Sequence, residues 1–124
     1  FAELDAAARC GADLRFDGVV RRAEGDAAAA RDLHALDYEV YEPMASRLLL
    51  GLAESIAREH GLASIVALHS RGAVPVGATS FVLRVRSPHR AEAIVAVTAF
   101  IDRLKRDVPI WKRPVWASGE QQLR

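Results

Sequence analysis

Hydrophobic and polar residues alternate along three segments of the chain, and this period of two is typical of a half-buried β-strand. The segments span residues 12–21, 36–41 and 81–86. Their inward positions are Leu14, Phe16 and Val20, then Leu36, Tyr38 and Val40, then Phe81, Leu83 and Val85. An uninterrupted apolar run at residues 64–68 predicts a short, fully buried strand.

Two longer segments repeat apolar residues every three or four positions, which predicts two amphipathic helices. The first helix begins with Pro43 in its first turn and ends near Gly61. The second begins at Ser87-Pro88, a capping hydroxyl followed by proline at the first helical position, and ends before Pro109. The predicted buried stripes are Met44, Leu48, Leu49, Leu52 and Ile56 on the first helix, and Ile94, Val97, Ile101 and Leu104 on the second.

Turns and a loop separate these elements. Residues 22–31 read as a mobile loop, although their four alanines are also compatible with a helical turn, and glycine and proline at residues 72–77 mark turns. Near the end, Val115 and Trp116 are compatible with a short strand. The resulting order β-β-α-β-β-α predicts one α+β domain over residues 1–124, with a mainly antiparallel sheet and two main helices.

Composition narrows the function classes. The 124 residues suit one domain, and 51% hydrophobic residues exclude a disordered chain. The net charge of +1 selects neither nucleic acid nor membrane, and no apolar run approaches the roughly 18 residues of a membrane span. A lone Cys10 indicates a reducing, cytoplasmic compartment. One cysteine and four scattered histidines lack metal-ligand spacing, so we expect neither metal nor cofactor.

Three groups of cations are candidates for binding an anion. His89 and Arg90 fall in the first turn of the second helix, where free N–H groups and the helix dipole favour a phosphate; two solvated side chains are the alternative. The cluster Lys105, Lys112 and Arg113 is by itself better explained as surface charge, with Lys105 neutralising the helix end and the neighbouring tryptophan in the core. Arg21, at the end of the first strand, fits either role.

Spacing along the second helix constrains how these groups combine. His89 and Lys105 are sixteen residues apart, which is roughly 24 Å at 1.5 Å per residue. Within one chain they cannot hold the same small anion. A two-fold dimer would bring the helix start of one protomer to the helix end of the other, so we expect a site shared across a dimer.

Three motifs of this chain together resemble the signature of the MoaE family, the large subunits of molybdopterin synthase. The motifs are Ser87-Pro88-His89-Arg90, the segment Ile101 to Lys105, and the segment Val108 to Arg113. Further matches are Gly11-Ala12, Phe16, Gly18, Val20-Arg21, Leu36 to Glu39, Tyr41, Pro43-Met44, His69, Gly72 and Gly77. The resemblance runs from about Gly11 to Arg113 and covers most of the chain.

The resemblance implies an alpha/beta-hammerhead fold, a homodimer and a sulfurtransferase activity. A small ubiquitin-like subunit of the MoaD type would dock on each protomer and insert its Gly-Gly tail, which carries a thiocarboxylate. Two sulfurs would pass to cyclic pyranopterin monophosphate and form the dithiolene of molybdopterin.

The resemblance also implies roles for individual residues. Lys105 and Lys112 would be catalytic, as acid, base or transient nucleophile. Phe16 and Met44 would shape the pocket wall or the core, and the His89–Arg90 pair would come from the neighbouring protomer. The implied substrate-binding set is Val19, Val20, Arg21, His89, Arg90, Lys105, Lys112, Arg113 and Pro114.

This sequence departs from the family pattern at three places. Pro114 stands where the family usually has glutamate, the His-Asn pair that commonly follows Arg21 is absent, and Ser70 replaces an arginine, although Arg71 follows it. These departures keep a second hypothesis open, a non-catalytic MoaE-like dimer that binds pterin phosphate or a ubiquitin-like tail. A plain dimeric scaffold with solvated basic residues is the third.

Overall fold

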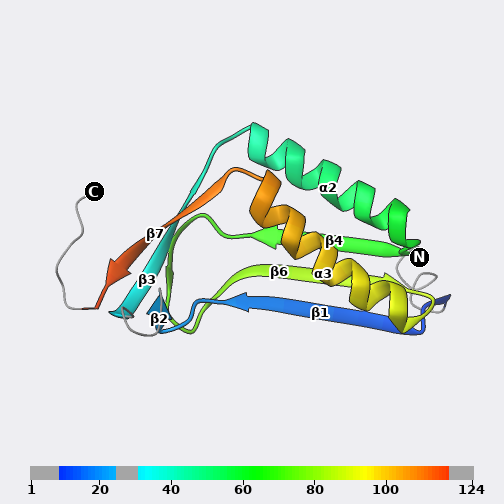
Figure 1. The fold of residues 1–124 in the computed structure, drawn as a ribbon, viewed down its shortest axis with the longest axis horizontal. Helices are drawn as coiled ribbons and strands as arrows, with labels where there is room; N and C mark the ends of the chain where they lie inside the picture. The colour runs from blue at the N-terminus through cyan, green and yellow to red at the C-terminus, as the bar shows by residue number, and fades with distance from the viewer. Residues whose placement is uncertain (1–8, 25–30, 118–124) are drawn as a thin grey trace.

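The computed structural model describes residues 9–24 and 31–117, and within these ranges two antiparallel sheets pack with two long helices. The elements in chain order are β1 Ala12–Val19, β2 Ala23–Glu24, β3 Arg31–Val40, α2 Met44–His60, β4 Ser64–His69, β5 Gly72–Pro75, β6 Thr79–Ser87, α3 Arg90–Asp107 and β7 Ile110–Trp116. The predicted α+β class with two main helices is therefore confirmed (Figure 1).

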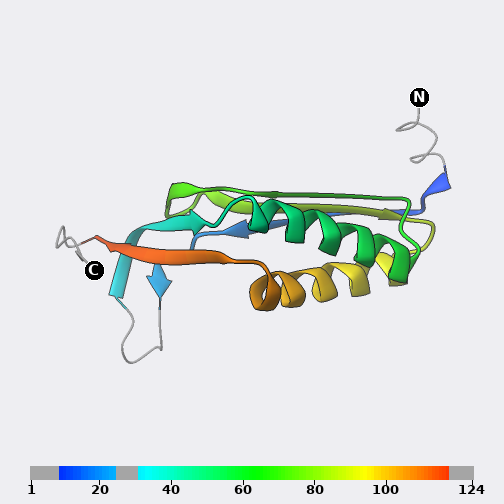
Figure 2. The same ribbon diagram turned by 90° about the horizontal axis from the view of Figure 1, so that it is seen from above.

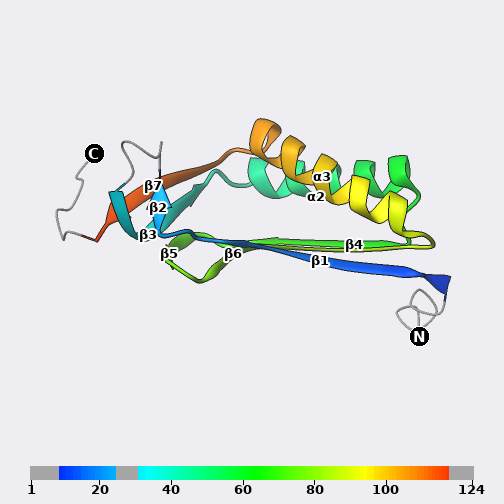
Figure 3. The same ribbon diagram turned by 60° about the horizontal axis from the view of Figure 1, so that its bottom comes forward.

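The first sheet has the order β1-β6-β4 and carries both helices on one face (Figure 3). The helices run antiparallel and side by side along it (Figure 2). Ile56 from α2, Phe100 from α3, and Leu83 and Val85 from β6 are fully buried between these layers. Burial of each such side chain contributes about 1.5–3 kcal/mol, so this interface holds the domain together.

The second sheet is built around β3, whose ten residues pair with β2, β5 and β7. It has its own small core of Val20, Leu33, Leu36 and Val74. It lies beyond the end of the helical layer where α2 starts and α3 finishes (Figure 1). The junction between the two sheets is therefore bordered by the last turn of α3 and by β7.

The predicted stripes are confirmed in part: Ile56 and Leu104 are buried, and Leu49, Leu52, Val97 and Ile101 pack against the core, but the first residues of each stripe are exposed. In α2, Ala45 and Ile56 are buried, whereas Met44 is 58% exposed and Leu48 is 41% exposed. In α3, Ile94 is 52% exposed. The residues of α3 that are buried are Ala93, Ala96, Phe100 and Leu104. Alanines occupy these buried positions because a small side chain lets each helix approach its neighbours closely.

The start of α3 lies two residues later than predicted. Ser87 is the last residue of β6, fully buried and in register with Ala12 of β1, so it serves the sheet rather than the helix. Its hydroxyl donates to the carbonyl oxygen of His89, which is the N-cap, and Arg90 is the first helical residue. The helix end before Pro109 and the left-handed Gly61 after α2 are as predicted.

The strands differ from the prediction in several places. The strand at residues 64–68 is not fully buried, because β4 is at the edge of a sheet with one covered face: Leu68 is 62% exposed. Within the segment expected as a loop, β2 pairs with β3, while residues 25–30 lie outside the described residues. The segment expected as turns contains β5, and the last strand begins five residues before Val115.

Within the described ranges, none of the helices has the length and apolar character needed to cross a membrane.

Candidate active site

A cavity of about 450 Å³ lies at the junction of the two sheets and α3. Five strands and the last turns of α3 contribute to its wall. Its lining residues are Phe16, Gly18, Tyr38, His69, Ser80, Phe81, Ile101, Leu104, Lys105, Ile110 and Lys112. The expectation that Phe16 shapes a pocket wall is therefore confirmed.

Both predicted catalytic lysines line this cavity. Lys105 comes from the last turn of α3, and Lys112 comes from β7, where it pairs in register with Tyr38. Both lysines are exposed. They are the only two lysines in the sequence, against fifteen arginines. A chain that uses arginine for nearly all its positive charges thus places both of its primary amines in one cavity.

A small polar network forms another part of the cavity wall. The hydroxyl of Tyr38 donates to the Ser80 hydroxyl oxygen at 3.1 Å, and Ser80 donates to the carbonyl oxygen of Gly18 at 3.2 Å. This chain links β3, β6 and β1 at the cavity floor. It fixes the position of the Tyr38 side chain, which is the register partner of Lys112 on the neighbouring strand.

His69 ends β4 and completes this wall. Its Nδ1 lies 2.7 Å from the carbonyl oxygen of Ser70. A carbonyl only accepts, so Nδ1 carries the proton. The ring packs edge-on against Tyr38, with centroids 4.9 Å apart, and against Phe81 at 5.7 Å. Burial lowers the pKa of His69 below its ordinary 6.5, although the bond to Ser70 acts the other way, so the imidazole is neutral at pH 7.

A second hollow, a groove of about 430 Å³, adjoins the cavity and shares Lys105, Ile110 and Lys112 with it. Its apolar wall consists of Met44, Leu48 and Trp111, all exposed. Trp111 was expected in the core but is 62% exposed, because it stands at an open edge of the second sheet. Met44 shapes a pocket wall, which is one of the two roles expected of it.

Two of the predicted binding residues on β7 lie outside the cavity lining. Successive residues of a strand point to opposite faces, so Arg113 faces away from Lys112 and reaches Glu39 at 3.4 Å. Pro114 shares the face of Lys112 and is half-buried opposite Leu36. In the described part of the second sheet β7 is an edge strand, where proline is tolerated.

The predicted residues at the end of β1 also stand apart from the lysines. Val20 is buried in the second core, and its backbone pairs with Ala78 and Gly77. Val19 is half exposed, and Arg21 is exposed beyond the strand.

His89 and Arg90 lie at the opposite end of α3 from the lysines, as the spacing required (Figure 1). Both side chains are exposed, and His89 Nδ1 lies 3.7 Å from Glu92 Oε2. One chain therefore places the exposed His89 and Arg90 at one end of α3 and the two-lysine cavity at the other.

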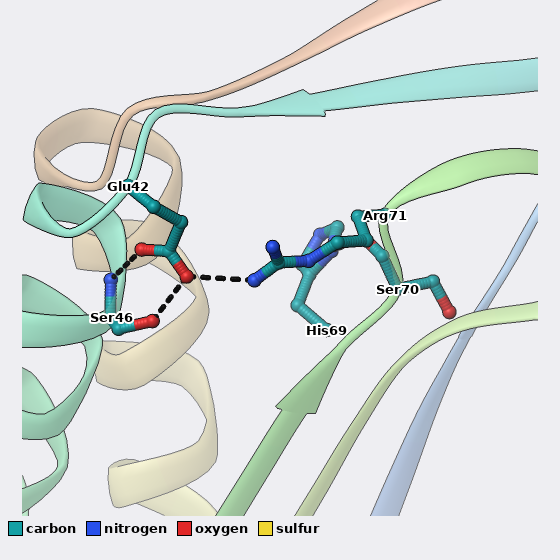
Figure 4. A network of polar contacts seen from close by, with 5 residues as sticks. All are labelled: Glu42, Ser46, His69, Ser70 and Arg71. Carbon is teal, nitrogen blue, oxygen red and sulfur yellow. Dashed lines mark hydrogen bonds and ion pairs between the residues drawn. The ribbon is translucent and has the colours of Figure 1, made fainter.

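An ion-pair network holds the turn that follows His69 (Figure 4). Arg71 donates to Glu42 at 2.7 Å, and Glu42 also accepts bonds from the backbone and hydroxyl of Ser46. The bonds from Ser46, followed by that from Arg71, lower the pKa of Glu42. Arg71 is thus directed to the start of α2 and does not line the cavity.

Sequence patterns missed the polar wall of the cavity. The sequence predicts only that Tyr38 lies on a strand face, and it marks His69 only as a match to the family pattern. No local motif connects residues so far apart in the chain, since β-pairing alone brings them together. Across residues 9–24 and 31–117, no group of three or more histidine, cysteine, aspartate or glutamate side chains is placed to hold a metal ion.

Comparisons with known proteins agree with this geometry. The family model described as MoaE protein matches residues 1–107. The molybdopterin synthase catalytic subunit of Bacillus subtilis is 38% identical over 113 residues, covering 91% of this chain and 69% of that protein. The Arabidopsis thaliana catalytic subunit is 37% identical over 120 residues; the match covers 97% of this chain but 59% of that protein.

A solved structure of molybdopterin synthase from Staphylococcus aureus matches with a TM-score of 0.78 and 31% identity, covering 90% of this chain and 78% of that one. Fold and site together define an α+β protein with a paired-lysine cavity, a class suited to group-transfer chemistry. The chain belongs to the MoaE family.

Proposed function

We propose that this chain is the catalytic subunit of a molybdopterin synthase. It transfers sulfur from a protein thiocarboxylate to cyclic pyranopterin monophosphate and so forms the dithiolene of molybdopterin. Membership of the MoaE family supports this assignment. Within the structure, the observation that carries it is the pairing of Lys105 and Lys112, the only lysines of the chain, in one cavity.

Lysine and arginine differ in the chemistry that they permit. An arginine guanidinium stays protonated and acts as a fixed charge, whereas a lysine amine can lose its proton and act as base or nucleophile. If the cavity needed positive charge alone, a chain with fifteen arginines would be expected to use them there. Two amines suit a reaction in which an acyl group is transferred from one atom to another beside an anionic substrate.

The sulfur donor that we propose is a small ubiquitin-like subunit with a Gly-Gly tail. The groove beside the cavity supports this partner, because Met44, Leu48 and Trp111 offer an exposed apolar wall that leads to both lysines. A structural neighbour from Helicobacter pylori, a complex of subunits 1 and 2 of molybdopterin-converting factor, shares the fold at a TM-score of 0.69 and 24% identity, over 96% of this chain and 80% of that one.

The pterin phosphate site that we propose is shared by two protomers. The helix start at His89 and Arg90 offers backbone N–H groups and two basic side chains, and it lies too far from Lys105 to act in the same chain. Exposure of all these side chains leaves them available to a second copy. Reaction in the cytoplasm fits the free Cys10.

One observation favours a second candidate, a non-catalytic relative that binds the tail or the pterin phosphate without turnover. Pro114 lies on the same face of β7 as Lys112, two residues further on, and it cannot supply a carboxylate there. The two candidates share the cavity and differ in whether product forms.

Single-turnover conversion of cyclic pyranopterin monophosphate by the wild-type dimer, with a thiocarboxylated small subunit, tests the proposal. We expect product from the wild type and a loss of at least about 100-fold, or roughly 2.7 kcal/mol of barrier, in Lys112→Ala. Lys112→Arg keeps the charge and should be equally impaired. Arg58→Ala, on an exposed turn of α2, is the control. Wild-type activity in Lys112→Arg would contradict the amine chemistry, and no wild-type product would favour the binding relative.

A further inference from the structure

His69 lines the cavity that contains both lysines, and one of its two ring nitrogens makes no hydrogen bond within the described residues. Its Nδ1–H is committed to the carbonyl oxygen of Ser70 at 2.7 Å, so Nε2 carries the lone pair of the neutral ring. Among the described residues, no buried side-chain nitrogen or oxygen lacks a hydrogen-bond partner. Nε2 has no hydrogen-bond partner among these residues, so it is not a buried atom. It is accessible on a side chain that lines the cavity.

Among the described residues that line the cavity, no acidic side chain faces His69. From α3 and β7 the cavity presents the cations Lys105 and Lys112, and from β3 it presents the uncharged Tyr38. The contributions of β1 and β6 are uncharged. On the segment of His69 itself, Arg71 is paired with Glu42 (Figure 4). Burial disfavours a protonated ring and outweighs the bond to Ser70, so the pKa of His69 lies below its ordinary value.

Sulfur transfer creates a step that needs a base. The thiocarboxylate sulfur displaces an oxygen from a carbon of the pterin, and the C–O bond breaks with its electron pair on the oxygen. The sulfur is still bonded to the acyl carbon of the tail, so the two molecules are joined as a thioester. This inference rests on the proposed function. Release of the tail by water requires a proton acceptor beside the acyl carbon, because neutral water is a weak nucleophile.

We propose that His69 is a catalytic residue of this cavity, the general base that activates water to split the thioester between tail and pterin. Water oxygen attacks the acyl carbon, and one of its protons passes to Nε2. The C–S bond breaks, and its electron pair leaves with the sulfur as a thiolate on the pterin. The tail departs as a carboxylic acid, which ionises, and the imidazolium returns its proton to solvent.

The substitution His69→Asn tests the role of Nε2 while it can preserve the hydrogen bond of Nδ1. In His69→Asn, the side-chain amide nitrogen can take the place of Nδ1 and donate to Ser70, while the position of Nε2 is empty. His60→Gln, at the far end of α2, is the histidine control. The reaction contains the wild-type or variant dimer, the thiocarboxylated small subunit and cyclic pyranopterin monophosphate. Acid-quenched samples are analysed by intact-protein mass spectrometry for a small subunit that carries the pterin.

We expect His69→Asn to accumulate the joined species and to split it at least about 100-fold more slowly than the wild type, the lower range for loss of a general base. Added imidazole should accelerate the splitting in the variant only. In the wild type the splitting rate should rise with pH below 6.5 and then level off, and the variant should lose this rise. His60→Gln should match the wild type.

The proposal is overturned if His69→Asn splits the joined species at the wild-type rate. It is also overturned if the variant is slow but keeps the pH dependence and gains nothing from imidazole, since that pattern indicates a structural role. If the variant does not fold, ¹⁵N NMR of wild-type histidines decides: a proton on Nε2 of His69 rules out the base. A wild type that forms neither joined species nor product overturns the proposed function, and this inference with it.

Discussion

Mixing two inactive variants tests whether the site is assembled from two protomers. Arg90→Ala removes a cation at the start of α3, and Lys112→Ala removes an amine from the cavity at its other end. The helix separates these ends by roughly 24 Å at 1.5 Å per residue, so a shared site must take one end from each protomer. Each variant alone should lose at least about 100-fold in activity, as typical for loss of one charge-stabilising group.

The activity expected from the mixture of the two variants can be calculated. Random exchange makes about half of the dimers mixed, and each mixed dimer has one site with both wild-type halves, so about one quarter of wild-type activity should return. The assay is single-turnover product formation before and after subunit exchange, with exchange verified by native mass spectrometry. Verified exchange without recovery would show that Arg90 and Lys112 act in the same protomer, and it would refute the distance argument.

Three further predictions concern the fold around the site. Phe100→Ala, at a fully buried position of α3, should lower the free energy of unfolding by about 3–5 kcal/mol in urea titration, and a loss below about 1 kcal/mol would contradict the assigned core. Tyr38→Phe should cost about 1 kcal/mol, because it removes the bond to Ser80; unchanged stability would count against that network. Because burial lowers the pKa of His69 in the folded state, the unfolded chain takes up its proton first. The wild type should therefore lose stability as pH falls below 6.5, and His69→Asn should lose less. Equal pH slopes of the two proteins in urea titrations would contradict a neutral, half-buried ring.

Local chemistry explains which elements were predictable from the sequence. Gly61 closes α2 because glycine adopts a left-handed φ of 63° without strain, and Pro109 ends α3 because proline lacks the backbone N–H that the helix needs. The alternating strands also follow directly from their period of two. Even so, Ser87 was assigned to the helix as a cap although it belongs to β6, because a serine before proline suits a cap and only the pairing with Ala12 shows otherwise.

The features that the sequence did not predict depend on contacts between distant segments of the chain. The buried faces of the helices are lined largely by alanines such as Ala93 and Ala96, which give a weak hydrophobic signal beside Ile94. The cavity could be anticipated only through its lysines, which the family motif supplies. Its other wall needs β3, β4 and β6 in register before Tyr38 and His69 meet, and no single-segment pattern contains that information.

Tracing the sulfur tests the central claim most directly. The small subunit is prepared with ³⁴S in its thiocarboxylate and reacted with cyclic pyranopterin monophosphate on the wild-type dimer and on Lys112→Ala. The account predicts that both sulfurs of the dithiolene product carry the label, and that the variant forms almost none. A wild-type dimer that binds tail and pterin phosphate but releases a pterin without labelled sulfur would contradict it.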